Sequence, residues 1–80
     1  MTNRQLFLIA CEWGKRTFVN PANIELTTWT HRTGIYVGFT DGYGRIFNVT
    51  LHRIQSVDSV LKTLDRDYAF AMLKDRGAAV

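Results

Sequence analysis

The chain has 80 residues, of which 46% are apolar, and its ten basic and seven acidic side chains give a net charge of +3. This composition excludes a disordered chain, and the length allows only one hydrophobic core. The single cysteine, Cys11, excludes an intramolecular disulfide framework. No apolar run approaches the ~20 residues of a membrane span. We expect one domain over residues 1–80 that resides in the cytoplasm and does not bind a membrane.

The positive charge lies in the first part of the chain. Residues 1–53 carry six basic and three acidic side chains, or +3, whereas residues 54–80 carry four of each, or zero. A basic region favours an acidic partner or a phosphate backbone. A net charge of this size is also ordinary for a small soluble domain.

The first apolar segment predicts a β-hairpin. The residues Leu6–Cys11 are all apolar, as in a strand that is covered on both faces. Gly14-Lys15 suits a type II′ turn between a strand over Leu6–Trp13 and a second one over Thr17–Val19. The turn signal at residues 20–23 follows. These two strands would form the N-terminal part of the sheet.

Three segments between residues 24 and 52 alternate apolar and polar side chains, which is typical of half-buried antiparallel strands. A two-residue loop at Arg32-Thr33 joins the first two segments, and a three-residue loop at Gly42-Tyr43-Gly44 joins the last two. These loops place apolar residues opposite apolar residues. The predicted pairs are Leu26–Phe39, Thr28–Val37, Thr30–Ile35, Ile35–Leu51, Val37–Val49, Phe39–Phe47 and Asp41–Arg45.

From Ser56 onward the apolar residues repeat at helical spacing. Ser56 suits the N-cap of this helix, and Gly77 suits its end. Phe70 and Leu73 fall on the side opposite the main apolar stripe. Either the helix breaks near residues 65–67 and restarts rotated, or its far face contacts a partner such as a second copy of the chain.

The elements together predict an α+β fold. An antiparallel meander sheet of four to five strands occupies residues 4–53, and a helical segment over residues 56–76 packs on one face of it. The registers place Trp29 opposite Tyr36, and Tyr36 opposite Thr50, on the second face of the sheet.

This second face has a structural and a functional interpretation. A cross-strand aromatic pair stabilises a sheet by roughly 0.2–1 kcal/mol without any ligand, and the N-terminal hairpin could also bury the face. The functional interpretation is an aromatic surface with a basic rim that binds a protein or stacks a nucleic-acid base. The predicted partner surface comprises Trp29, His31, Arg32, Tyr36, Arg45, His52 and Arg53.

The residue pattern does not favour catalysis, a metal or a cofactor. His31 and His52 fall next to Gly34 on the same face, but no acidic residue or cysteine is placed as a third ligand. Cys11 lies in the most apolar predicted strand, where a thiol resists ionisation. The registers suggest no paired carboxylates. We expect a protein that is not an enzyme.

Three segments of the chain occur in this order: Phe-Val-Asn-Pro-Ala-Asn-Ile at residues 18–24, Thr-Gly-Ile-Tyr-Val-Gly-Phe-Thr-Asp-Gly at residues 33–42, and a helix start Val-x-x-Val-Leu at residues 57–61. Together they resemble the short FlbD-type flagellar proteins. The resemblance covers about half of the chain. This chain departs from it in a longer polar segment over residues 27–33 and a longer helical tail. The resemblance implies the meander architecture only, and no functional residue.

A small non-catalytic domain with a charged aromatic surface is also similar in format to inhibitors from phages and mobile elements, such as anti-CRISPR proteins. This similarity implies a bacterial or phage-infected cytoplasm and a multi-subunit nucleoprotein complex as partner. We therefore expect a non-enzymatic protein-binding module that acts by steric occlusion. Two alternatives remain open: a nucleic-acid-binding protein that uses the same face, and a homodimeric adaptor, similar to FlbD, joined through Phe70 and Leu73.

Overall fold

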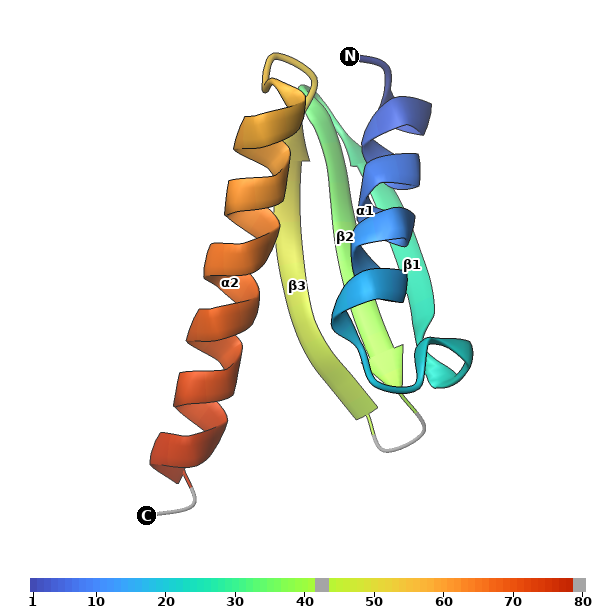
Figure 1. The fold of residues 1–80 in the computed structure, drawn as a ribbon. Coiled ribbons are helices and arrows are strands. Elements are labelled where there is room, and N and C mark those ends of the chain that lie inside the picture. The colour runs from blue at the N-terminus through green and yellow to red at the C-terminus, as the bar shows by residue number, and fades with distance from the viewer. Residues whose placement is uncertain (42–43, 79–80) are drawn as a thin grey trace.

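The helices and the strands form two layers (Figure 1). The computed structural model describes residues 1–41 and 44–78, except for the side chains of Arg45 and of residues 75–78. The strands form one antiparallel sheet in the order β1-β2-β3, and helices α1 and α2 both pack on the same face of it. The elements in chain order are α1 (Asn3–Thr17), the 3-10 helix η1 (Pro21–Asn23), β1 (Glu25–His31), β2 (Gly34–Asp41), β3 (Gly44–His52) and α2 (Val57–Ala78).

The N-terminal segment is a helix, so the predicted β-hairpin over Leu6–Trp13 and Thr17–Val19 is wrong. Thr2 caps this helix, because its hydroxyl accepts the Gln5 N–H at 3.1 Å and the Gln5 side chain accepts the Thr2 N–H at 2.8 Å. The three residues between the buried Leu6 and Ala10 are apolar too, which conceals the helical period. The described sheet therefore has three strands rather than four to five. The buried residues share one side of α1: Leu6, Ala10, Trp13 and Gly14.

The α+β class and the antiparallel meander are confirmed, and so are six of the seven predicted pairs. Both hairpins keep the apolar residues on the face that carries the helices. A shift by one residue would have moved every apolar side chain to the other face, so the alternation determines the register strongly. The confirmed pairs are Leu26–Phe39, Thr28–Val37, Thr30–Ile35, Ile35–Leu51, Val37–Val49 and Phe39–Phe47.

A β-bulge changes the end of the β2–β3 hairpin. Asp41 lies opposite Gly44 rather than Arg45, so the predicted Asp41–Arg45 pair is wrong. Ile46 is the extra residue of β3, and its side chain packs against the core. Gly44 has φ +133°, a conformation that favours glycine. The rest of the predicted loop, residues 42 and 43, lies outside the described residues.

Helix α2 starts where the sequence predicts it. The Ser56 hydroxyl accepts the Ser59 N–H at 3.1 Å, which confirms Ser56 as the N-cap. The helix continues through residues 65–67, so the break that we considered there does not occur. It also continues through Gly77, the predicted stop, to Ala78.

Trp13 lies at the centre of the core and is only 5% exposed. Its indole makes edge-on contacts with Phe18, Phe39, Phe47 and Tyr68 at ring-centroid distances of 5.4 to 5.8 Å. These rings come from the end of α1, from β2, from β3 and from α2. Edge-to-face aromatic pairs contribute about 0.5–1.5 kcal/mol beyond the area that they bury. One side chain thus joins both helices to two of the strands.

A hydrogen bond fixes the orientation of this indole. The Trp13 Nε1–H donates to Asp65 Oδ1 at 2.8 Å, which links α1 directly to α2. The bond satisfies a donor that the aromatic rings would otherwise leave without a partner.

Trp13→Ala should lower the free energy of unfolding by about 3–5 kcal/mol, because it removes the shared partner of four rings. Urea denaturation followed by circular dichroism measures this change. Trp29→Ala is the matched control, since Trp29 is 50% exposed, and it should cost about 1 kcal/mol or less. Equal losses in the two variants would contradict the central position of Trp13.

Candidate functional site: the open face of the sheet

No helix or strand that the structure describes covers the sheet face opposite α1 and α2, and we call this face the open face. The N-terminal segment packs on the other face as α1, so it does not bury this surface. The open face is built from alternate residues of the three strands, which the register arranges in cross-strand rows. The rows are Glu25 and Thr40; Thr27, Gly38 and Asn48; Trp29, Tyr36 and Thr50; and His31, Gly34 and His52.

Two aromatic side chains dominate the open face. Trp29 lies directly opposite Tyr36, as predicted, and the two are 50% and 45% exposed. A β-carbon on Gly38 would lie 3.4 Å from Cζ3 of Trp29. The indole therefore lies across the β2 backbone, where glycine leaves room for it. The result is a broad aromatic surface.

His31 belongs to the same surface, and its ring is held by hydrogen bonds. The ring packs against Tyr36 at a centroid distance of 4.6 Å, with the two ring planes tilted by 49°, and lies 5.2 Å from the His52 ring. Its Nε2 is 3.2 Å from the Leu51 carbonyl oxygen, which can only accept, so Nε2 carries the proton. Its Nδ1 accepts the Thr33 N–H at 3.1 Å. The ring thus links the β1–β2 turn to β3. The described residues hold no cluster of three His, Cys, Asp or Glu side chains for a metal ion.

The rings of His31 and His52 approach each other because Gly34, which lies between them in the cross-strand row, has no side chain. A β-carbon on Gly34 would overlap the carbonyl oxygen of Leu51 and lie 2.9 Å from Cα of His52. Both of these atoms belong to the backbone of β3, so neither can move without shifting the strand. The close approach of β2 to β3 therefore requires glycine at position 34.

Gly34→Ala should therefore lower the free energy of unfolding by about 1–3 kcal/mol, as overpacking does. Gly38→Ala is the control, because the atoms nearest its new β-carbon are the side-chain oxygens of Thr27 and Asn48, at 2.9 and 3.0 Å. Its loss should be smaller, since side chains can rotate. Thermal denaturation of both variants measures the difference, and an unchanged stability of Gly34→Ala would contradict the close approach.

Of the three arginines of the predicted basic rim, Arg53 is held by hydrogen bonds. Arg53 donates through Nη1 to Asn3 Oδ1 at 2.9 Å and through Nη2 to the Arg32 carbonyl oxygen at 2.8 Å. It therefore fastens the β1–β2 turn to the start of α1. Arg32 is exposed in that turn. Arg45 is paired with Thr40 in the sheet, and its side chain lies outside the described residues.

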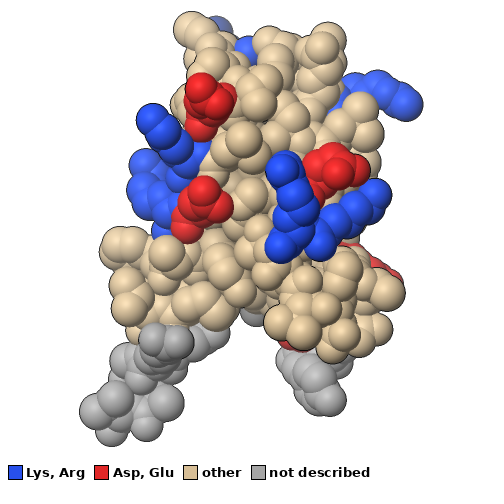
Figure 2. All heavy atoms as spheres, in the orientation of Figure 1, with Lys and Arg blue, Asp and Glu red and all other residues tan. Residues whose placement is uncertain are grey.

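The charged side chains visible on the helix-covered side of the molecule are of both signs. Figure 2 shows basic and acidic groups interspersed there, with no field of one sign. On the open face, Glu25 is the only charged residue among the described side chains. The described side chains of the open face are thus mainly aromatic and polar.

Phe70 and Leu73 do not belong to the open face. They lie on α2 and are 72% and 65% exposed, so the structure separates them from Trp29 and Tyr36. They form a second apolar patch of the molecule.

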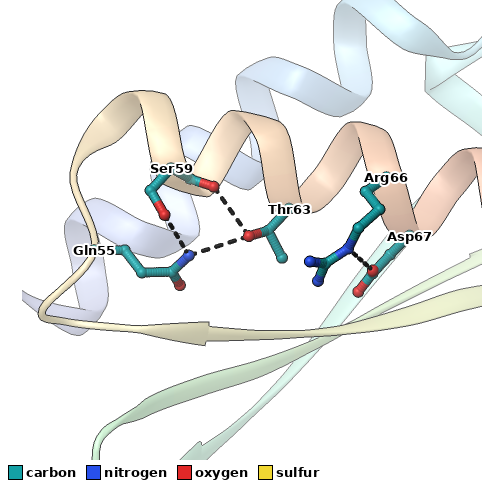
Figure 3. Close-up of polar contacts among 5 residues, drawn as sticks. All are labelled: Gln55, Ser59, Thr63, Arg66 and Asp67. Atoms are coloured by element: carbon teal, nitrogen blue, oxygen red, sulfur yellow. Dashed lines mark hydrogen bonds and ion pairs between the residues drawn. The ribbon is translucent and has the colours of Figure 1, made fainter.

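A polar groove of about 580 Å³ lies between β3 and α2, and it was not among the predicted sites. Figure 3 shows the Gln55 amide donating to Ser59 Oγ at 3.0 Å and to Thr63 Oγ1 at 3.1 Å. The sequence signal for this groove is a polar side chain at every fourth residue from Gln55 to Asp67. Because these groups bond to one another, they hold the start of α2 beside β3. The groove is lined by Asn48, Thr50, His52, Gln55, Ser59, Thr63, Arg66 and Asp67.

Cys11 lies on α1 and not in a strand. Burial raises the pKa of its thiol, and the nearby Lys15 lowers that pKa by a smaller amount. The thiol therefore has less thiolate at a given pH than a free cysteine, and the thiolate is the nucleophile. This environment does not activate a catalytic cysteine.

Iodoacetamide at about pH 8 should alkylate Cys11 more slowly in the folded protein than in urea, because its raised pKa reduces the thiolate fraction near the usual thiol pKa. Lys15→Ala should slow the reaction further, since it removes the charge that lowers the pKa. Mass spectrometry over time measures both rates. A folded-state rate equal to the rate in urea would show that burial does not protect this thiol.

No family model, curated protein or solved structure matches this chain significantly. Neither helix, over the residues that the structure describes, is long and apolar enough to cross a bilayer.

Proposed function

We propose that this protein is a non-enzymatic binding module that recognises another protein with the open face of its sheet. The observation that carries the proposal is the exposed pair of Trp29 and Tyr36 on a face that both helices leave bare. Large aromatic residues at the centre of a surface are the usual anchors of protein interfaces. The His31 ring, which packs against Tyr36, extends this aromatic area.

The charge distribution favours a protein partner over nucleic acid. Binding of a phosphate backbone depends on lysine and arginine side chains that release counterions. Arg53 is hydrogen-bonded to Asn3 and to the Arg32 carbonyl. Apart from Arg32 and Arg53 beside the β1–β2 turn, the described side chains of the open face include no lysine or arginine. The cores of protein interfaces, in contrast, are depleted in charge and enriched in aromatic residues.

The mode of action that we propose is steric occlusion. A rigid face on a domain of 80 residues can cover a functional surface of a larger assembly without any chemistry of its own. The narrower proposal is an anti-CRISPR-like inhibitor of a bacterial nucleoprotein complex, carried by a phage or mobile element. The support for it is that such inhibitors are also small domains with a charged aromatic surface. It indicates that a partner should be sought in bacterial lysate.

The first experiment is capture of partners from bacterial lysate by the tagged protein, with and without nuclease. We expect a stoichiometric protein complex that survives nuclease treatment. Affinity for the purified complex should change little with salt, because few phosphate contacts are made. Capture that disappears with nuclease, together with a steep loss of affinity in salt, would instead support the nucleic-acid-binding alternative.

Trp29→Ala and Tyr36→Ala should each weaken binding to the captured partner by about 2 kcal/mol or more, which is about 30-fold in Kd. Calorimetric titration with the wild type and each variant measures this change. Phe70→Ala is the matched control, since it removes an exposed ring from α2 and should leave affinity unchanged. If only Phe70→Ala weakens binding, the interface lies on α2 and the assignment of the open face is wrong.

A further inference from the structure

Strand β1 is an edge of the sheet with few of the features that prevent edge-to-edge pairing. Its seven residues, Glu25–His31, contain no lysine, arginine or proline, and its register with β2 is unbroken. Four consecutive residues of the strand, 27–30, are exposed. Natural proteins protect such edges with charges, prolines, bulges or covering elements. The contrast suggests that β1 has a partner.

The hairpin geometry shows which backbone groups of β1 are available. A two-residue turn closes the β1–β2 hairpin, so the flanking His31 and Gly34 form a hydrogen-bonded pair. Alternate residues counted back from His31 direct their N–H and C=O groups toward β2. The residues between them direct theirs away from the sheet, where the described part of the chain offers no hydrogen-bond partner: Leu26, Thr28 and Thr30.

The opposite edge of the sheet is in a different situation. The backbone N–H and C=O groups of β3 that point away from β2 face the polar groove, and α2 forms the other wall of this groove. The His52 N–H already donates to Gln55 Oε1 at 2.8 Å. In Figure 1, α2 runs alongside β3, whereas η1 lies only at the end of β1. Among the described elements, β1 is therefore the more accessible edge.

We propose that β1 pairs antiparallel with β1 of a second copy of this chain, about a two-fold axis at Thr28. The outward groups of three residues on each copy then meet their counterparts, so the edge is self-complementary. Parallel in-register pairing would instead place Glu25 opposite the partner's Glu25 and align like charges. The register is Thr28 opposite the partner's Thr28, Leu26 opposite the partner's Thr30, Thr27 opposite the partner's Trp29 and Glu25 opposite the partner's His31.

This pairing would join two sheets of three strands into one sheet of six strands. The open face would become continuous across the axis, with the two Trp29 side chains as diagonal neighbours about 7–8 Å apart. A contact of one strand per copy is small, so the dimer should be weak, with a Kd in the micromolar range or above. The pairing does not depend on the proposed function, because it needs no partner other than this chain.

Site-directed cysteine cross-linking tests the register. In a Cys11→Ala background, Thr28→Cys should form a disulfide-linked dimer, because hydrogen-bonded pairs place their Cα atoms about 5.5 Å apart. Thr30→Cys is the matched control, since in this register the two copies of residue 30 are about 14 Å apart. We expect cross-linking of Thr28→Cys at least about ten-fold faster than that of Thr30→Cys. Equal rates would overturn the register.

Sedimentation from about 10 µM to about 1 mM tests the edge itself. The wild type should shift from monomer toward dimer, and Thr28→Pro should remain a monomer with an unchanged circular dichroism spectrum, because proline removes only an outward N–H. Thr28→Lys is the second variant, since it places like charges on the axis while residue 28 stays exposed. A wild type that is monomeric throughout would overturn the proposal. A dimer that survives Thr28→Lys but not Phe70→Ala would also overturn it and locate the contact on α2.

Discussion

The aromatic cluster around Trp13 is the interaction on which the rest of the structure depends. One indole contacts rings from the end of α1, from β2, from β3 and from α2, and its N–H bonds to Asp65 across the two helices. A three-stranded sheet has only two faces, so a cluster that gathers both helices on one face leaves the other without cover. The bare face is thus a consequence of how the core is packed.

What this bare face displays is determined by two glycines and a turn. Gly38 lets the Trp29 indole lie across β2, and Gly34 lets the rings of His31 and His52 approach each other. The hydrogen bonds that hold His31, together with those of Arg53, keep the β1–β2 turn in place. This end of the aromatic surface is therefore preorganised, which would reduce the entropy lost on binding the proposed partner.

The meander and its registers could be predicted because a period of two is unambiguous when one face is buried. The pairing of Trp29 with Tyr36 followed directly from it. Helix α1 could not be recognised from its apolar content, because six consecutive apolar residues satisfy a strand and a helix equally. The capping box of Thr2 and Gln5 was the local signal that distinguishes them.

The composition of the site was less predictable than its position. A sequence shows that Arg53 is charged, but not that its guanidinium is bonded to Asn3, a residue fifty positions away. The polar stripe that begins at Gln55 likewise takes its meaning only from the β3 edge beside it. Long-range contacts of this kind decide whether a side chain serves the fold or a partner.

Acrylamide quenching of the two tryptophans is the most direct test of a packed face opposite an open one. Trp29→Phe leaves Trp13 as the only indole, and Trp13→Phe leaves Trp29. The structure predicts weak quenching of Trp13, which is 5% exposed, and several-fold stronger quenching of Trp29, which is 50% exposed. Equal quenching of the two, or a protected Trp29, would contradict the arrangement in which both helices cover one face and leave the aromatic face bare.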